Sequence, residues 1–246
     1  MTWTRNSVVR CSEMAHRKTT VKNPQPRPEL GEQTSLADRA YELLEERIVT
    51  RQLAPGVMLS ESNLASELSM GRTPVREALA RLEWLGFVEV HARRGVQVSS
   101  VDVIGHLELL EVRLPLETTV ARHVIERATP VDIKELQALA DKLSEAAAER
   151  NRDKYFRIKR SLHETEVRAA YNPVLTQTMR SLHAQSRRFW FTYERTERFP
   201  EAAERHRLIV HYLAKHDAKR AVAAVEALFS FLEAMTKQAL ERRGPS

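Results

Sequence analysis

Cysteine, glycine and long apolar runs are all scarce in this chain of 246 residues. The single cysteine, Cys11, excludes an internal disulfide and leaves no thiolate cluster to hold a metal. Seven glycines leave few residues for the tight turns of a sheet protein, and no glycine-rich phosphate loop is present. No segment reaches the roughly 18 uninterrupted apolar residues of a membrane span, and the first residues lack the apolar core of a secretion signal. We therefore expect a cytoplasmic, long-helix protein without membrane contact.

The positive charge is small and unevenly spread. The net charge is +6, which hints weakly at a polyanionic partner. Residues 1–33 mix basic, polar and proline residues without a sustained apolar period, which predicts a flexible basic tail. That tail could contact DNA phosphates or be a solvated extension without a role. Residues 34–101 hold eight arginines against nine acidic residues, so DNA affinity there would depend on a few placed cations.

Residues 34–101 show three helical periods followed by two short alternating segments. Thr34 and Ser35 are candidate N-caps of the first helix, Ser60 caps the second, and Pro74 lies in the first turn of the third, where a missing N–H costs nothing. The expected elements are helices at 34–53, 60–68 and 73–85 and strands at 87–91 and 96–99 around a basic turn. This order predicts a winged helix-turn-helix domain with a small β-hairpin wing.

Basic side chains stand where such a domain meets DNA. Arg72 and Arg76 lie four residues apart on one face of the third helix, and arginine suits bidentate contact with guanine. Thr73 can bond a phosphate or touch a thymine methyl, and Arg93 and Arg94 suit the minor groove or phosphate. Gly95 beside them permits close backbone approach. The alternative is that these arginines are surface charges paired with acidic neighbours, of which Glu67, Glu77 and Glu89 are candidates.

Two stretches of this domain carry a family resemblance. Leu59–Ala65 reads LSESNLA, and Gly71–Leu82 reads GRTPVREALARL. Together they resemble the signature of the GntR family of bacterial transcription regulators. The resemblance implies DNA contacts in the recognition helix and a wing tip, at Arg72, Thr73, Pro74, Arg76 and Gly95. Asn63 stands where many members have a DNA-contacting arginine, and Ser69 where the turn usually has glycine, so the operator sequence stays open.

Residues 102–246 predict an all-helical domain, because no period-2 segment follows Ile104. The expected helices are 104–127, 130–149, 152–170, 173–195, 200–215 and 217–241. The fold class is therefore mostly α, with a winged helix-turn-helix and an all-α bundle of about six helices. Arg187 and Arg188, next to an aromatic run, are interpreted as packing side chains whose charged ends reach solvent.

This half resembles the FCD-type effector domain that accompanies the GntR winged helix. The residues that carry the resemblance are Glu111–Arg113 with Glu117, His163 ahead of Ala169–Pro173, and Glu204–Arg207 before Asp217. The resemblance implies dimerisation through this domain, a small carboxylate bound between its helices and, in many members, a divalent metal held by one aspartate and three histidines. His163 and His206 match two of these ligand positions, but Lys159 and Leu228 stand at the other two. A lysine repels a divalent ion and two imidazoles are too few ligands, so no metal cofactor is expected.

We hypothesise that Lys159 replaces the electrostatic role of the metal. With Arg113, His163 and His206 it would bind the carboxylate of a small organic acid directly. The alternative is that both histidines are ordinary core residues and that Lys159 points to solvent.

The sequence thus predicts a regulator and not an enzyme. We expect a homodimeric repressor that binds double-stranded operator DNA and whose affinity is set by a small organic acid. One alternative is a metal-dependent all-helical enzyme that uses His163 and His206, and another is an effector-free dimeric DNA-binding protein. Convergence of Arg113, Lys159, His163 and His206 on one cavity with room for a ligand would separate the first interpretation from the last.

Overall fold

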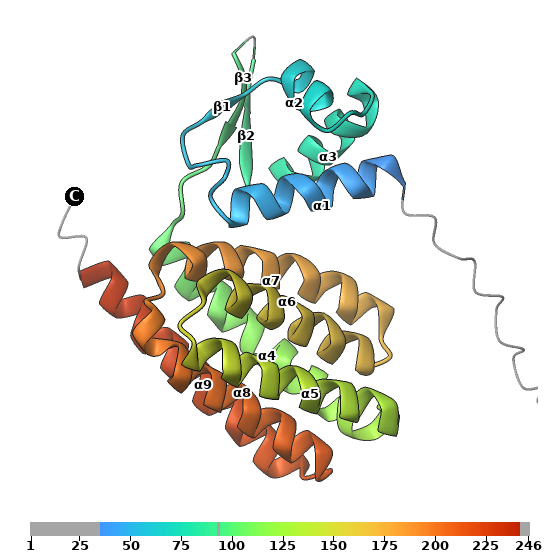
Figure 1. Ribbon diagram of the computed structural model, residues 1–246, viewed down its shortest axis with the longest axis vertical. Coiled ribbons are helices and arrows are strands. Elements are labelled where there is room, and N and C mark those ends of the chain that lie inside the picture. The colour runs from blue at the N-terminus through green and yellow to red at the C-terminus, as the bar shows by residue number, and fades with distance from the viewer. Residues whose placement is uncertain (1–34, 93, 242–246) are drawn as a thin grey trace, which may run out of the picture. The chain divides into compact units, whose positions relative to one another are not determined.

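Two groups of elements follow one another in the computed structural model, which describes residues 35–92 and 94–241 (Figure 1). The expected tail at 1–33 and the candidate residues Thr34 and Arg93 lie outside these residues. Within them, the N-terminal winged-helix domain consists of α1 (Leu36–Val49), β1 (Met58–Leu59), α2 (Glu61–Glu67), α3 (Arg72–Trp84), β2 (Val88–His91) and β3 (Gly95–Val98). The helical bundle consists of α4 (Val103–Arg127), α5 (Pro130–Ala148), α6 (Arg152–Ala169), α7 (Pro173–Tyr193), the 3₁₀ turn η1 (Thr196–Arg198), α8 (Phe199–Ala214) and α9 (Ala218–Glu241).

The wing is a three-stranded antiparallel sheet with the strand order β1-β3-β2. Val88 pairs with Val98 and His91 with Gly95, which confirms the expected hairpin. The sequence did not predict β1, whose Met58 and Leu59 pair with Gln97 and Val96 of β3. Two residues are too few to show a period of 2, so this strand exists only through its partner.

Polar caps fix where the helices begin. Ser35 caps α1 in a capping box with Asp38: the Ser35 hydroxyl accepts from the Asp38 N–H at 3.0 Å, and the Asp38 carboxylate accepts from the Ser35 N–H at 3.3 Å. Ser60 stands at the N-cap of α2, but its hydroxyl contacts that of Ser62 and does not cap the helix. In the bundle, the helix starts are capped by Asp102, Thr129, Asn151 and Asn172. These four caps mark the starts of α4 to α7, whereas α8 begins without a side-chain cap. All the expected bundle helices agree with the structure to within two residues.

Each domain has its own apolar core, and α7 contributes to both. Tyr155, Phe189 and Phe199 are among the largest fully buried side chains of the bundle core. The winged-helix core packs Leu44 and Ile48 of α1 against helix α3 and the sheet, and it also includes Ala184 of α7. In Figure 1, α1 runs beside α7. Among the described residues, no helix is both long and apolar enough to cross a bilayer.

Candidate functional site

Helix α3, the candidate recognition helix, presents its first turn to solvent. Arg72 and Thr73 are exposed and Pro74 is half-buried in that turn, as expected. Val75, Ala78, Leu79 and Leu82 form the opposite, buried face of the helix. Because the helix is anchored by this apolar face, its polar N-terminal turn stays free to enter a groove.

Arg76 lies one turn after Arg72 and is held by a partner on the preceding helix. Its Nη2 donates to Oε2 of Glu61 at 2.9 Å, and its Nε donates to the same oxygen at 3.1 Å. The pair is exposed, with 69% of the Arg76 side chain open to solvent. The partner is therefore Glu61, which was not among the acidic neighbours considered from the sequence, and the pair fixes the guanidinium on the exposed face.

Gly95 is required by the sheet itself. Its φ of +101° lies in the region that favours glycine, and a Cβ there would come within 2.9 Å of the carbonyl oxygen of Leu59. Gly95 thus permits the close approach of β3 to β1, and the approach of the wing tip to DNA stays a prediction. Arg94 is exposed in the turn just before it, with its N–H bonded to the His91 carbonyl.

A cavity lies in the middle of the helical bundle, between α4, α6, α7, α8 and α9. It is narrow: the space open to the centre of a water molecule is about 20 Å³, room for about one water. All four residues proposed as effector ligands line it, namely Arg113, Lys159, His163 and His206. Leu228 lines it too, so the four positions that the family resemblance singled out face one space. Lys159 is 3% exposed, so the alternative that it points to solvent is wrong.

A buried carboxylate joins two of the cavity helices, α4 and α7. Oε1 of Glu117 accepts from Arg113 Nη2 at 2.6 Å and lies 2.8 Å from Nε2 of His183. Arg113 Nη1 donates to the Ser186 hydroxyl at 2.7 Å. Burial raises the pKa of Glu117, but the charge of Arg113 and the hydrogen bonds from His183 and Arg113 outweigh it and hold that pKa below its usual range. Glu117 is therefore ionised and neutralises Arg113 from within the bundle.

Three histidine rings cluster beside this carboxylate. The His163 ring stacks on that of His183 with 4.4 Å between centroids and lies 5.3 Å from that of His206. Burial lowers the pKa of all three, and the positive charges of Lys159 and Arg113 add to this at His206, whose pKa falls to about 3. The rings are therefore neutral near pH 7. Neutral imidazoles can offer a ligand either a donor or an acceptor nitrogen.

Lys159 has only a distant counter-charge. Its Nζ is 4.0 Å from Oε2 of Glu194, an ion pair too long for a hydrogen bond. Neither carboxylate oxygen of Glu194 has a hydrogen-bond partner, although both are buried. Burial lowers the pKa of Lys159 and raises that of Glu194, and the attraction between them opposes both shifts. Lys159 thus lies farther from its counter-charge than Arg113 does from Glu117.

Several buried polar atoms around the cavity have no hydrogen-bond partner. They include Nδ1 of His163, Nε2 of His206, and Nε of both Arg113 and Arg187. Buried polar atoms are nearly always paired in folded proteins. A concentration of unpaired nitrogen atoms on one cavity is therefore typical of a place that receives a polar ligand.

The cavity does not fit the divalent metal that the family resemblance implies. In the part of the chain that the structure describes, no three or more His, Cys, Asp or Glu side chains are grouped to hold a metal ion. Lys159 brings an ammonium and Leu228 an apolar side chain to two of the four positions. These residues suit a carboxylate better than a cation.

Arg187 and Arg188 correct one sequence interpretation. Both are 6% exposed, so their charged ends do not reach solvent. Arg187 pairs with Glu45 of α1 and also lines the cavity, while Arg188 donates to the Ser99 carbonyl. Burial lowers the pKa of Arg188 to about 10. The snorkelling interpretation failed because both guanidinium groups find partners in other elements, and the sequence does not show those partners.

The sequence reasoning also overlooked His183, Glu166 and Glu194. One signal was available: His183 precedes Arg187 by four residues, the spacing that places two side chains on one helix face. Glu166 lines the cavity, and burial together with the charge of Glu117 raises its pKa to about 8. It is therefore mainly protonated near pH 7 and can donate a hydrogen bond.

Two family models match this chain. Residues 36–98 match the model described as bacterial regulatory proteins, gntR family, and residues 108–231 match the FCD domain. The chain is 30% identical to the HTH-type transcriptional regulator McbR of Escherichia coli K12 over 139 residues, which are 56% of this chain and 63% of McbR. It thus spans less than two thirds of that relative.

Two further comparisons agree with these matches. The chain is 32% identical over 126 residues, 49% of its own length and 74% of the other, to an HTH-type transcriptional regulator from the TAR-I ttuE-ttuC' intergenic region of Agrobacterium vitis. The solved structure of E. coli McbR/YncC superposes with a TM-score of 0.74 at 24% identity, covering 84% of this chain and 99% of that one. At that identity the superposition establishes the fold.

Fold and matches together define a winged-helix regulator with a helical C-terminal domain. The chain belongs to the GntR family of bacterial regulatory proteins and carries an FCD domain. Its relatives are transcription regulators and not enzymes, which removes the alternative of a metal-dependent helical enzyme.

Proposed function

We propose that this protein is a homodimeric, cytoplasmic transcription repressor whose affinity for operator DNA is set by a small organic acid. Residues 34–101 bind the DNA, and residues 102–246 bind the acid and form the dimer. The observation that carries the proposal is the convergence of Arg113, Lys159, His163 and His206 on one buried cavity.

DNA recognition depends on the exposed basic residues of α3 and the wing. Arg72 and Arg76 are exposed on the first turns of α3, and Arg94 is exposed beside the wing tip. Arginine at these positions suits guanine in the major groove, while the wing arginine suits phosphate or the minor groove. Since acidic residues balance the arginines of this domain, a dimer that engages two half-sites supplies affinity that bulk charge does not.

The effector chemistry follows from the unpaired donors. A ligand carboxylate placed between Lys159, His163 and His206 would give Lys159 the close counter-charge that it lacks. Charge-assisted hydrogen bonds of this kind are stronger than neutral ones, and more so away from water. Lys159 thereby takes over the electrostatic role that a metal ion has in related sites.

Because the cavity is narrow, an organic acid can bind there only if the surrounding helices move. With space for about one water molecule, it cannot admit an organic acid unless the helices around it shift. A ligand that binds only a rearranged bundle shifts the population of the two arrangements. The four side chains converge as the effector interpretation requires, and the room for a ligand depends on this shift of the helices.

The effector claim is tested by thermal unfolding of the purified protein with citrate, succinate, malate, gluconate and glucuronate. A ligand of the folded state raises the unfolding midpoint by mass action. We expect one acid to raise it equally with added divalent metal and after chelation. Lys159→Ala should abolish the shift. The control is Lys154→Ala, which removes another lysine of α6 whose ammonium pairs with Glu149 of the preceding turn, and it should retain the shift.

Three results would count against this account. A shift that requires metal, or an unfolding midpoint that collapses on chelation, would show that other groups replace the missing ligands. A full shift in Lys159→Ala would refute the role of that lysine. No shift with any acid would favour the effector-free alternative.

The DNA claim is tested on duplexes selected from a random pool by the wild-type protein. Arg72→Ala and Arg76→Ala should each weaken binding by about tenfold or more, since a bidentate contact to a base contributes about 1–3 kcal/mol. Arg220→Ala, a 69% exposed arginine on α9, is the matched control and should leave the affinity unchanged. Equal affinities for all three variants would refute the assignment of the recognition helix.

A further inference from the structure

Arg187 contacts both the cavity of the bundle and the winged-helix domain. It lines the cavity of the bundle, and its Nη2 donates to Oε1 of Glu45 on α1 of the winged-helix domain. The side chains of the pair are 7% and 5% exposed, so both charges are shielded from water. The Nε of Arg187 is buried without a partner. One guanidinium thus faces the proposed ligand and the DNA-binding domain together.

The same stretch of α7 joins the two domains through apolar contact. Ala184, three residues before Arg187, is fully buried in the winged-helix core. His183, next to it, faces the cavity and bonds Glu117. A shift of this helical turn therefore acts on the cavity and on the winged-helix core at the same time.

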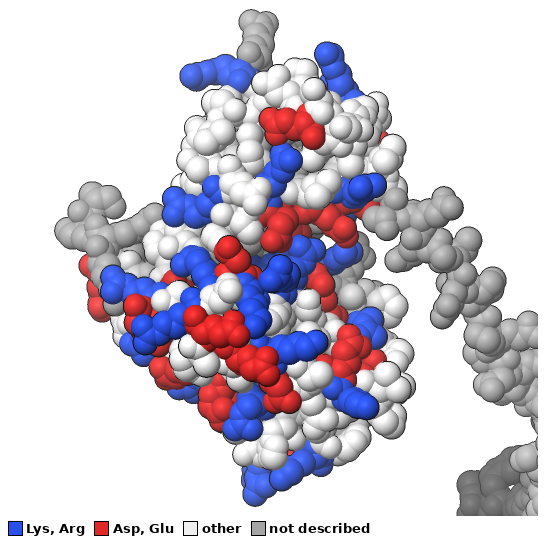
Figure 2. Space-filling model, viewed as in Figure 1, with Lys and Arg blue, Asp and Glu red and all other residues white. Residues whose placement is uncertain are grey.

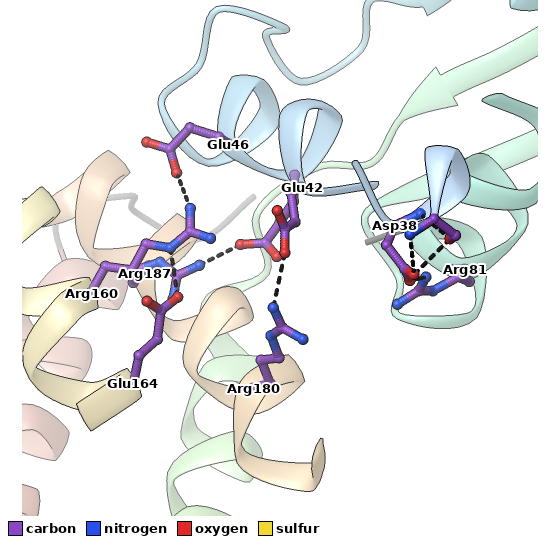
Figure 3. Close-up of polar contacts among 10 residues, drawn as sticks. Asp38, Glu42, Glu46, Arg81, Arg160, Glu164, Arg180 and Arg187 are labelled. Atoms are coloured by element: carbon purple, nitrogen blue, oxygen red, sulfur yellow. Dashed lines mark hydrogen bonds and ion pairs between the residues drawn. The ribbon is translucent and has the colours of Figure 1, made fainter. Parts of the chain in front are cut away.

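Helix α1 carries such a shift to the recognition helix. Leu44 and Ile48 of α1 share one core with Val75, Leu79 and Leu82 of α3. Asp38 of α1 also binds Arg81 of α3, with 2.5 Å between Oδ1 and Nη1 (Figure 3). Because packed cores transmit displacement, α1 and α3 move together.

Two other ion pairs cross the same junction but differ in their surroundings. Arg160 reaches Glu46 and Arg180 reaches Glu42, each at 2.9 Å (Figure 3). Figure 2 shows acidic side chains of the winged-helix side meeting basic side chains of the bundle here. The Arg180–Glu42 pair is 58% and 39% exposed and does not line the bundle cavity. Exposed pairs are screened by water and contribute little, so this pair is a natural control.

We infer that Arg187 couples the cavity to the DNA-binding domain. This rests on the proposed function: a ligand carboxylate in the cavity competes with Glu45 for the Arg187 guanidinium. When Glu45 is released, α1 is no longer held to α7, and α3 leaves the position in which the dimer fits its operator. Arg187 is then a positioning residue that contacts no DNA base.

The test compares two pairs on the same two helices. Operator affinity is measured by fluorescence anisotropy, without added acid, on a duplex selected by the wild-type protein. Arg187→Gln and Glu45→Gln should each lower the affinity at least tenfold, and the double variant should lose no more than either single one. Arg180→Gln and Glu42→Gln should change it less than twofold. Circular dichroism and the unfolding midpoint verify folding; if Arg187→Gln does not fold, Glu45→Gln carries the test, since it changes no side chain of the bundle.

A second readout separates coupling from a structural role. With the acid of the five-member panel that most raises the wild-type midpoint, operator affinity should fall at least tenfold in wild type and in Arg180→Gln. In Glu45→Gln, which leaves every cavity side chain in place, the acid should still bind but change operator affinity less than twofold.

The outcomes distinguish this inference from the proposed function. If the wild-type protein selects no duplex, or no acid alters its affinity, the proposed function fails and the inference with it. If the wild type behaves as proposed but the buried-pair and exposed-pair variants give equal affinities and equal acid responses, the inference alone is overturned. An affinity that rises in Glu45→Gln would also overturn it.

Discussion

His183 on α7 and Glu117 on α4 share a buried hydrogen bond, with 2.8 Å between Nε2 of the histidine and Oε1 of the glutamate. Arg113 donates to the same oxygen. The bundle therefore already holds one carboxylate between a guanidinium and an imidazole. We propose the same kind of contact for the carboxylate of a ligand in this cavity. Glu117 makes that contact with a carboxylate of the protein itself.

Glu117→Ala should destabilise the protein by about 3–5 kcal/mol, because it leaves the charge of Arg113 buried without its partner. Glu111→Ala, on the exposed face of the same helix, should change stability by less than about 0.5 kcal/mol. Urea unfolding of the two variants measures both values. Equal values would mean that Glu117 does not hold this network together.

Gly95→Ala should destabilise the winged-helix domain more than Gly56→Ala. Both glycines have positive φ, but only at Gly95 would the added Cβ approach a backbone oxygen, that of Leu59, to 2.9 Å. We expect about 1 kcal/mol for the backbone strain at Gly56 and at least about 2 kcal/mol at Gly95. Chemical denaturation checks the order, and a larger loss at Gly56 would contradict it.

Ser69→Gly should stabilise the protein by about 0.5–1 kcal/mol. Ser69 ends the turn after α2 with φ of +54°, a conformation that costs a residue with a Cβ more than glycine. Ser66→Gly, three residues earlier on the exposed face of α2, should instead cost about 0.5 kcal/mol. Thermal or urea unfolding of both variants decides the matter. A loss of stability in Ser69→Gly would be inconsistent with strain in this turn.

Acidification should destabilise the protein below pH 6.5. Burial lowers the pKa of four histidines, which are His106, His163, His183 and His206, and their neutral forms are buried in the fold. The unfolded chain binds protons on these rings first, so their stabilising effect is present above pH 6.5 and is lost as the pH falls toward the folded-state values, about 3 for His106 and His206. Glu166, with a pKa raised to about 8, acts in the opposite direction and offsets part of this loss.

The histidine contribution is measured as a difference between pH 7.5 and pH 5.5. His206, whose pKa falls to about 3, should cost about 1 kcal/mol over this interval. His206→Asn should therefore lose about 1 kcal/mol less than the wild type in urea unfolding. An equal loss in both proteins would show that His206 is not held neutral by the fold.

Local signals in the sequence made the helices predictable, whereas nothing in the sequence predicted the contacts between them. Asp102, Thr129, Asn151 and Asn172 are caps that mark helix starts without any tertiary information. The strand β1 was missed because its two residues are defined by pairing with β3.

The same division holds at the site. Lys159 and His163 lie one helical turn apart, so their shared face follows from spacing, and the family resemblance added Arg113 and His206. The pair of Glu45 and Arg187 joins residues 142 positions apart, and no periodicity connects them. The burial of Arg187 and its pairing with Glu45 are determined only when α1 packs on α7.

The most direct test of the central claim is operator affinity measured with and without the acid that most raises the unfolding midpoint, after metals are removed by chelation. The account predicts that the acid raises the dissociation constant of the wild-type protein for its selected duplex at least tenfold under these metal-free conditions, and that Lys159→Ala abolishes the response. An unchanged dissociation constant, or a response that returns only when a divalent metal is added, would contradict it.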